Sequence, residues 1–127
     1  MAWDVLIVDD SAVMRQFIRR VAALSGIEVS RYREAGDGFQ ALAALEAEKA
    51  NLVLTDLNMP GMDGEEMVRR MRSIEALASI PVIVISTDAT ASRMNALLAL
   101  GACGYLQKPF GPEMLLAELQ RVMGGPV

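Results

Sequence analysis

Short apolar runs alternate along the chain with longer amphipathic segments. Residues 5–8, 52–54 and 81–85 are apolar throughout, with no polar alternation. Runs of this kind are typical of strands covered on both faces, as in a parallel sheet. Residues 29–34 are more polar and alternate, which predicts an edge strand. A last short run at 103–106 predicts a fifth strand.

Five segments between and after these runs have helical patterns. Apolar residues share one face in three of them: Met14, Phe17, Ile18 and Val21; Met67, Met71 and Ile74; Leu115, Leu119 and Val122. Segments 37–49 and 88–100 are rich in alanine and leucine. The predicted N-terminal caps are Ser11, Asp37, Asp63 and Asp88, and Pro112 suits a first turn. The order is (βα)5, which predicts a doubly wound α/β fold with helices on both faces of a parallel sheet.

Length and hydropathy bound the organisation. The chain has 127 residues, which suits a single domain over residues 1–127. Residues 124–127 are either a tail or the start of a linker. Mean hydropathy is +0.30, but the longest uncharged apolar stretch, 96–106, is far shorter than the roughly 20 residues that cross a bilayer. The N-terminus has no signal-peptide pattern, so we expect a cytoplasmic protein without membrane attachment.

The charged and reactive residues narrow the chemistry. The chain has no histidine, so it has no imidazole base, imidazole metal ligand or phosphohistidine of its own. Cys103 is alone and can form neither an internal disulfide nor a cysteine zinc site. A net charge of −4 and a pI near 4.8 argue against binding nucleic acid through phosphate neutralisation. Carboxylates, hydroxyls, lysine, arginine and an oxygen-bound metal remain.

Polar residues follow four of the predicted strands. Asp9 and Asp10 end the first, Asp56 the third and Ser86 the fourth, while Lys108 follows the fifth. Taken singly, each has an ordinary explanation as a helix cap, a turn residue or a surface lysine. In an open α/β sheet, however, the carboxyl ends of the strands meet at one crevice. The sequence therefore predicts that all five side chains converge there.

Three clustered carboxylates repel one another, and Lys108 offsets only one charge. An all-oxygen site with room for waters suits Mg²⁺. A metal-associated aspartate beside a lysine and a hydroxyl is suited to phosphoryl transfer, because a carboxylate can accept the group covalently while cations neutralise its oxygens.

These motifs resemble a known family. Asp9-Asp10, the segment from Leu54 to Gly64 that contains Asp56, Ser86, and Tyr105 with Lys108-Pro109-Phe110 resemble the receiver domain of bacterial two-component response regulators. The likeness covers essentially the whole chain and is strongest to the single-domain, CheY-like chemotaxis type. It implies the strand order 2-1-3-4-5.

The resemblance also implies a role for each site residue. Asp56 would be the phosphoacceptor, taking the group from a phosphohistidine. Asp10 and Asp56 would bind Mg²⁺ directly, Asn58 through its backbone carbonyl and Asp9 through water, with Mn²⁺ as a possible substitute. Ser86 and Lys108 would contact phosphoryl oxygens. The Lys108–Pro109 bond would be cis.

A switch and its partners follow from the same resemblance. Ser86 would move toward phosphorylated Asp56, and Tyr105 would turn inward, which remodels the face made by the fourth helix, fifth strand and fifth helix. The expected partners are a sensor histidine kinase or histidine phosphotransfer protein, and a downstream target such as the flagellar switch. We expect a monomer or a weak phosphorylation-dependent dimer, and no turnover enzyme, since the chain catalyses only its own phosphorylation and dephosphorylation.

Some positions depart from the family pattern. Ser86 replaces the commoner threonine and keeps the hydroxyl, whereas Thr87 replaces a small residue and can crowd access to the site. Asn58 and Asp88 occupy positions that tune loss of the phosphoryl group. Arg93 is the single basic residue of the fourth helix, which is less basic than a typical motor-binding face.

Three other interpretations stay open. A haloacid-dehalogenase-like phosphatase also uses a strand-end aspartate, but it normally has a second aspartate at the position of Asn58. A flavodoxin-like FMN carrier needs a phosphate-binding turn where Asp9 and Asp10 would repel phosphate. A phosphorylation-independent pseudo-receiver would lack acceptor residues that are intact in this chain.

Overall fold

A five-stranded parallel sheet forms the centre of the protein. The structure, a computed structural model, describes residues 2–88 and 90–125. The strands are β1 (Trp3–Val8), β2 (Val29–Ala35), β3 (Leu52–Asp56), β4 (Val82–Ser86) and β5 (Gly104–Gln107). Their order is β2-β1-β3-β4-β5, and all four pairings are parallel. The predicted fold class and strand order are confirmed.

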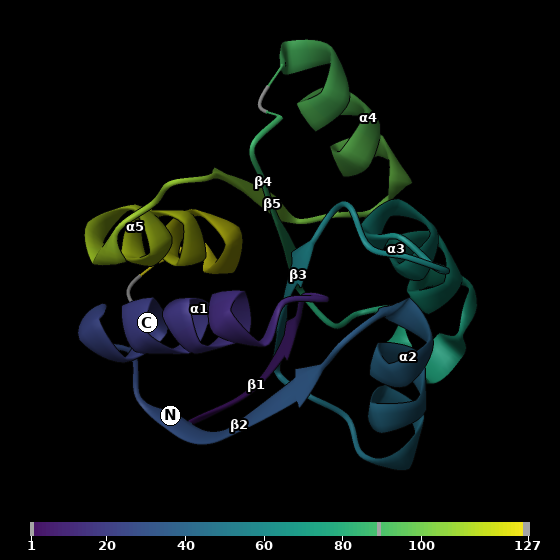
Figure 1. The fold of residues 1–127 in the computed structure, drawn as a ribbon, viewed down its shortest axis with the longest axis horizontal. Helices are drawn as coiled ribbons and strands as arrows, with labels where there is room; N and C mark the ends of the chain where they lie inside the picture. The colour runs from purple at the N-terminus through teal and green to yellow at the C-terminus, as the bar shows by residue number, and fades with distance from the viewer. Residues whose placement is uncertain (1, 89, 126–127) are drawn as a thin grey trace.

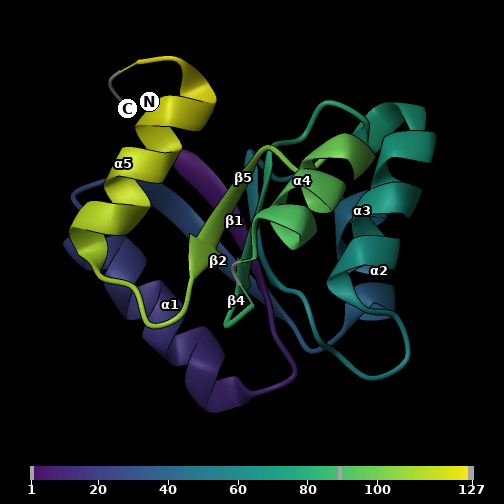
Figure 2. The ribbon, with the colours of Figure 1, turned by 90° about the horizontal axis from the view of Figure 1, so that it is seen from above.

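Helices cover both faces of this sheet. They are α1 (Ala12–Leu24), α2 (Gly38–Ala47), α3 (Gly64–Ser73), α4 (Ala91–Leu100) and α5 (Pro112–Met123), with a 3-10 helix η1 (Glu75–Leu77) that the sequence did not predict. Helices α1 and α5 lie on one face, and α2, α3 and α4 lie on the other (Figure 1). The view from above shows the same two layers (Figure 2). No helix in the described ranges is long and apolar enough to cross a bilayer.

The two helical layers explain the uninterrupted apolar runs. Along β1, Val5 and Ile7 pack in the core on the α1 and α5 side, whereas Leu6 and Val8 pack in the core on the opposite side. Successive strand residues point to opposite faces, so every position of a strand that is covered on both faces is buried and favours an apolar residue. The more polar strand β2 lies at the sheet edge, as its alternation predicts.

Side-chain caps fix the starts of the first three helices. Ser11, Asp37 and Asp63 each accept a hydrogen bond from the backbone N–H three residues later. The predicted cap at Asp88 is wrong. Helix α4 begins later, and Thr90 caps it by accepting from the N–H of Arg93 at 3.3 Å. Asp88 instead accepts from the N–H of Thr90 at 3.2 Å, because its short carboxylate folds back on the connection before the helix.

Strand β5 is the second edge of the sheet, and helix α5 covers its outer side. Glu118 accepts a hydrogen bond from the N–H of Tyr105 at 2.7 Å, and Arg121 donates to the carbonyl of Cys103 at 3.1 Å. Glu118 and Arg121 also form an ion pair of 2.8 Å. The N–H of Tyr105 in β5 and the carbonyl of Cys103 just before the strand are therefore bonded within the chain.

Candidate functional site

The strand ends bring the predicted carboxylates together. Asp9 and Asp10 directly follow β1, and Asp56 is the last residue of β3, the strand next to β1. One carboxylate oxygen from each of the three lies within 4.8 Å of the others. The ammonium of Lys108, which follows β5, lies 3.2 Å from Oδ1 of Asp56 and 3.5 Å from Oδ2 of Asp9. The predicted convergence is confirmed for these four residues.

Burial makes this cluster electrostatically unbalanced. Asp9 is 2% exposed and Asp56 is 7% exposed, whereas Asp10 is open to solvent. Burial is the largest influence on Asp9 and raises the pKa of its carboxyl, with Asp56 and Asp10 adding repulsion. The Ser11 N–H and Lys108 oppose this shift without cancelling it. The cluster thus holds more negative charge than its neighbours neutralise.

The donor set fits a hard divalent cation. Among the described residues, Oδ2 of Asp9 is a buried oxygen without a hydrogen-bond partner. Buried polar atoms normally have one, so this oxygen is a candidate for a further ligand or water. Two buried carboxylates, an exposed third and no nitrogen or sulfur donor match the preference of Mg²⁺ for oxygen ligands and retained water.

Main-chain contacts hold Asp56 in place. The N–H of Leu57 donates to Oδ1 of Asp56 at 2.9 Å, and Gly64 donates to the carbonyl of Leu57 at 2.8 Å. This second bond folds the loop that contains Asn58 back onto the end of β3. A Cβ on Gly64 would lie 2.4 Å from the Asp56 carbonyl oxygen, so only glycine fits there. Asn58, the predicted carbonyl ligand, has an exposed side chain in this loop.

Arginine 15 supports the turn after β1, a role that the sequence did not reveal. Its guanidinium donates to the Asp9 carbonyl at 2.6 Å and pairs with Glu34 of β2 at 2.8 Å. The Asp9 carboxylate itself accepts from the N–H of Ser11 at 2.9 Å. Arg15 lies in the first turns of an amphipathic helix, where arginine is common, so no local pattern distinguished it.

Ser86 links the loops that follow β4 and β5. It is 1% exposed at the end of β4, and its Oγ accepts from the N–H of Asp88 at 3.1 Å. Its carbonyl accepts from the N–H of Lys108 at 2.8 Å, and the Lys108–Pro109 bond is cis as the resemblance implied. Ser86 therefore lies at the same sheet edge as the carboxylates and is tied through the backbone to Lys108.

Comparison with known proteins identifies the family of this arrangement. Residues 5–120 match the response regulator receiver domain. The chain belongs to this family. Receiver domains are signalling modules of two-component systems rather than turnover enzymes, and they bind Mg²⁺ in their acidic pocket.

Chemotaxis proteins are prominent among the relatives of this receiver. It is 37% identical over 120 residues to chemotaxis protein CheY1 of Helicobacter pylori, covering 94% of this chain and 95% of that protein. It is 32% identical to CheY of Pseudomonas aeruginosa, covering 93% and 94%.

Solved receiver structures share the fold. Vibrio cholerae CheY4 superposes with a TM-score of 0.84 at 35% identity, covering 96% of this chain and 99% of that one. The receiver domain of sensor histidine kinase PA1611 from Pseudomonas aeruginosa has a TM-score of 0.83 at 28% identity, covering 98% and 100%. That structure has a magnesium ion coordinated in its active site cleft.

The predicted switch residue of this receiver is buried. Tyr105 is 8% exposed and lies in the core on the side of α2, α3 and α4. Its hydroxyl is buried without a hydrogen-bond partner among the described residues. Tyr105 is thus buried in this structure, and a buried phenol without a hydrogen bond is energetically costly.

Proposed function

We propose that this receiver accepts a phosphoryl group on Asp56 from a phosphohistidine of a partner protein, in a Mg²⁺-dependent reaction. The observation that carries the proposal is the position of Lys108, whose ammonium contacts both Asp56 and Asp9 inside a cluster of three carboxylates. A lysine that served only to balance charge would neutralise one carboxylate, and would leave no reason for burying a second one beside it and placing a third nearby. A site for a cation and an anionic group explains both.

Each side chain has a role in this reaction. Asp56 attacks phosphorus, so that an Oδ–P bond forms as the P–N bond breaks and the imidazole nitrogen keeps the electron pair. Lys108 neutralises one phosphoryl oxygen, and the Ser86 hydroxyl donates to another. Asp9, Asp10, Asp56 and the Asn58 carbonyl would hold Mg²⁺, with Mn²⁺ as a substitute. The metal supplies further neutralisation of phosphoryl charge.

Phosphorylation would change partner binding through the face made by α4, β5 and α5. Ser86 turns its hydroxyl toward the new phosphoryl group and gives up its bond from the Asp88 N–H. This draws in the start of the β4–α4 connection, at Thr87 and Asp88. The likeness to chemotaxis proteins favours a flagellar-switch target and a chemotaxis kinase or phosphotransfer protein as donor. We propose a cytoplasmic receiver, monomeric or weakly dimeric when phosphorylated.

Intact-protein mass spectrometry tests the acceptor. Wild type incubated with phosphoramidate and Mg²⁺ should gain one phosphoryl group, and Asp56→Asn should gain none. Asp37→Asn is the matched control, because it makes the same change at a helix cap where asparagine works equally well. Equal phosphorylation of Asp56→Asn would contradict the assignment. A wild type that gains nothing would indicate a phosphorylation-independent pseudo-receiver.

A further inference from the structure

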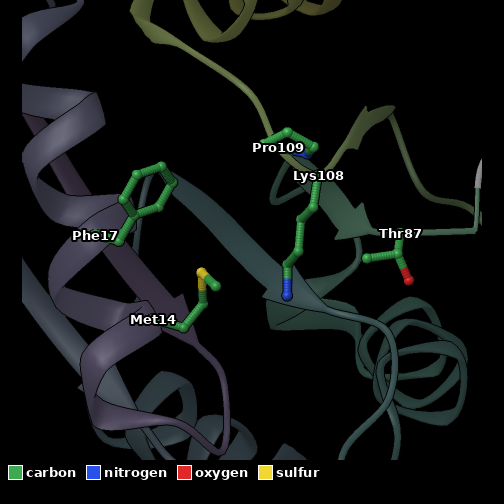
Figure 3. Close-up of a pocket in the computed structure, with 5 residues that line it drawn as sticks. All are labelled: Met14, Phe17, Thr87, Lys108 and Pro109. Atoms are coloured by element: carbon green, nitrogen blue, oxygen red, sulfur yellow. The ribbon is translucent and has the colours of Figure 1, made fainter.

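Arg15 leaves helix α1 on the side of the edge strand β2. The residue before it, Met14, lines a groove of about 350 Å³ together with Phe17 and Lys108 (Figure 3). One residue turns an α-helix by about 100°, so Arg15 lies on another side of α1, where its guanidinium pairs with Glu34 of β2 at 2.8 Å. The Arg15 side chain is 19% exposed. It is therefore largely enclosed between α1 and β2 and is not part of that groove.

The second contact of Arg15 is with the acidic site. Its Nη1 donates to the Asp9 carbonyl oxygen at 2.6 Å, and this carbonyl belongs to the peptide unit that joins Asp9 to Asp10. A peptide unit is planar, so fixing its oxygen also fixes the plane in which the chain enters Asp10. Asp10 is open to solvent, so packing does not set the direction of its carboxylate. The orientation of that carboxylate thus depends on main chain that Arg15 holds.

Two other hydrogen bonds hold the same turn, and both involve Asp9. Its N–H donates to the carbonyl of Ala35 in β2 at 3.1 Å, and its carboxylate accepts from the N–H of Ser11 at 2.9 Å. Neither bond involves the carbonyl that Arg15 contacts. The bond from Arg15 therefore constrains the Asp9–Asp10 peptide in a way that the other two do not.

Glu34 offsets the positive charge that Arg15 brings near the acidic cluster. It accepts from Nε of Arg15 at 2.8 Å, while Nη1 of the same guanidinium bonds the Asp9 carbonyl. An unpaired arginine beside a site for a divalent cation would repel the ion. A paired arginine can orient the main chain at a smaller electrostatic cost. The guanidinium suits this task because it is planar and donates from several nitrogens in fixed directions.

We propose that Arg15 is a positioning residue for the Mg²⁺ site, and that its bond to the Asp9 carbonyl sets the affinity for the ion by orienting Asp9 and Asp10. The inference rests on the proposed function, in which both carboxylates hold the metal. Groups that orient a metal ligand reduce the freedom it loses on binding. Their removal typically weakens metal binding about 10- to 100-fold. Strand β2 then contributes to the site through Glu34, at one residue's distance from the ligands.

Isothermal titration calorimetry with Mg²⁺ alone measures the Kd, at a temperature where circular dichroism shows each variant to be folded. We expect Arg15→Gln to raise the Kd about tenfold. The sign separates positioning from charge, because loss of a nearby cation would by itself favour Mg²⁺ and lower the Kd. Arg15→Lys keeps the charge, but its compact ammonium does not reproduce the two directed bonds, so the Kd should rise about threefold.

Arg33→Gln is the matched control. Arg33 precedes Glu34 in β2, and its guanidinium likewise pairs with a carboxylate and donates to main-chain carbonyls, but it does so beside Asp4 at the other end of β1. This variant should lose stability in urea and keep the wild-type Kd. A Kd that is unchanged or lower in Arg15→Gln, or that rises equally in Arg33→Gln, would overturn the positioning role.

Arg15→Lys decides the question if Arg15→Gln fails to fold, and a wild-type Kd in Arg15→Lys counts equally against the proposal. Failure of the proposed function has a different outcome. Wild type would then bind no Mg²⁺ and gain no phosphate from phosphoramidate, and the role of Arg15 would be rejected with it. If the role of Arg15 alone is wrong, wild type keeps both properties and the Arg15 variants share its Kd.

Discussion

Strand β1 has an acidic site at each end, and the two are held in opposite ways. At its start, Asp4 contacts two arginines of β2, Arg31 and Arg33, and Arg31 also pairs with Glu48 at 3.0 Å. At its end, Asp9 and Asp10 lie beside Asp56 with one lysine between them. Arginines balance the carboxylate charge at the N-terminal end of β1, whereas the C-terminal end keeps an excess of negative charge.

The support of the two ends differs as well. Ion pairs across β1, β2 and the end of α2 hold Asp4, and its N–H donates to the Asn51 side chain at 2.8 Å. Close-packed main chain holds the site end, through the Ser11 and Leu57 N–H groups and the contact of Gly64 with Asp56. Balanced charge is typical of a structural site. Unbalanced charge on a rigid backbone is typical of a site that binds something else.

Replacing Gly64 by alanine tests the rigid backbone and should have the largest effect. The new Cβ would overlap the Asp56 carbonyl at 2.4 Å, and both groups are main chain that moves little. We expect the free energy of unfolding to fall by about 3 kcal/mol, measured by urea denaturation. Gly36→Ala is the control, because its Cβ would meet only the flexible side-chain ends of Gln40 at 3.3 Å and Arg15 at 3.8 Å. Equal losses in the two variants would contradict the packing argument.

Adding Mg²⁺ tests whether the charge excess is a binding site. At a free concentration of 100 times Kd, we expect the ion to stabilise the fold by about 2.7 kcal/mol, seen as a rise in Tm by calorimetry. Asp56→Asn should lose most of this rise, and Asp4→Asn should keep all of it. A rise of the same size in all three proteins would indicate nonspecific screening of an acidic chain.

Neutralising one carboxylate at each end should shift stability in opposite directions without Mg²⁺. Asp9→Asn removes a buried, repelled charge and keeps an acceptor for the Ser11 N–H, so we expect a gain of about 1 kcal/mol. Asp4→Asn leaves two arginines short of a partner and should cost about 1 kcal/mol. Urea denaturation in the presence of a chelator measures both. If both variants lost stability, or both gained it, the proposed difference between the two ends of β1 would be wrong.

We expect the smallest effect in the pH dependence of the stability difference between Asp9→Asn and wild type. The pKa of Asp9 is raised above its ordinary value of 3.8, so the native state binds this proton more tightly than the unfolded state does. The contribution of Asp9 to the free energy of unfolding therefore becomes more favourable to the native state as the pH falls from neutral toward 4. The difference between Asp9→Asn and wild type should narrow over that interval, by less than about 1 kcal/mol. A difference that widens on acidification would mean that Lys108 outweighs burial.

The sequence predicted the parts of this site that depend on strand ends. Apolar runs located the strands, and the residues that follow them had to meet at one edge, so Asp9, Asp56 and Lys108 could be brought together without a structure. The strand order came from the family resemblance, since apolar runs alone do not decide which strands are neighbours.

Contacts between distant segments could not be predicted. The bond from Arg15 to the Asp9 carbonyl depends on how α1 packs, and the start of α4 depends on how the loop after Ser86 folds. Phe17 was predicted on the buried face of its helix, yet it is 41% exposed, because Phe110 meets it from the neighbouring loop and leaves one side open. Helical periodicity gives a direction for a side chain but not the distance to its partner.

Helix α5 also limits pairing between the edge strand β5 and a strand of another copy of this protein. A sheet edge with free N–H and carbonyl groups is a template on which further strands of other copies can assemble. Glu118 already accepts from the N–H of Tyr105 on β5, and Arg121 donates to the carbonyl of Cys103 just before that strand. These two side chains therefore leave fewer free groups at this edge with which a strand of another copy could pair.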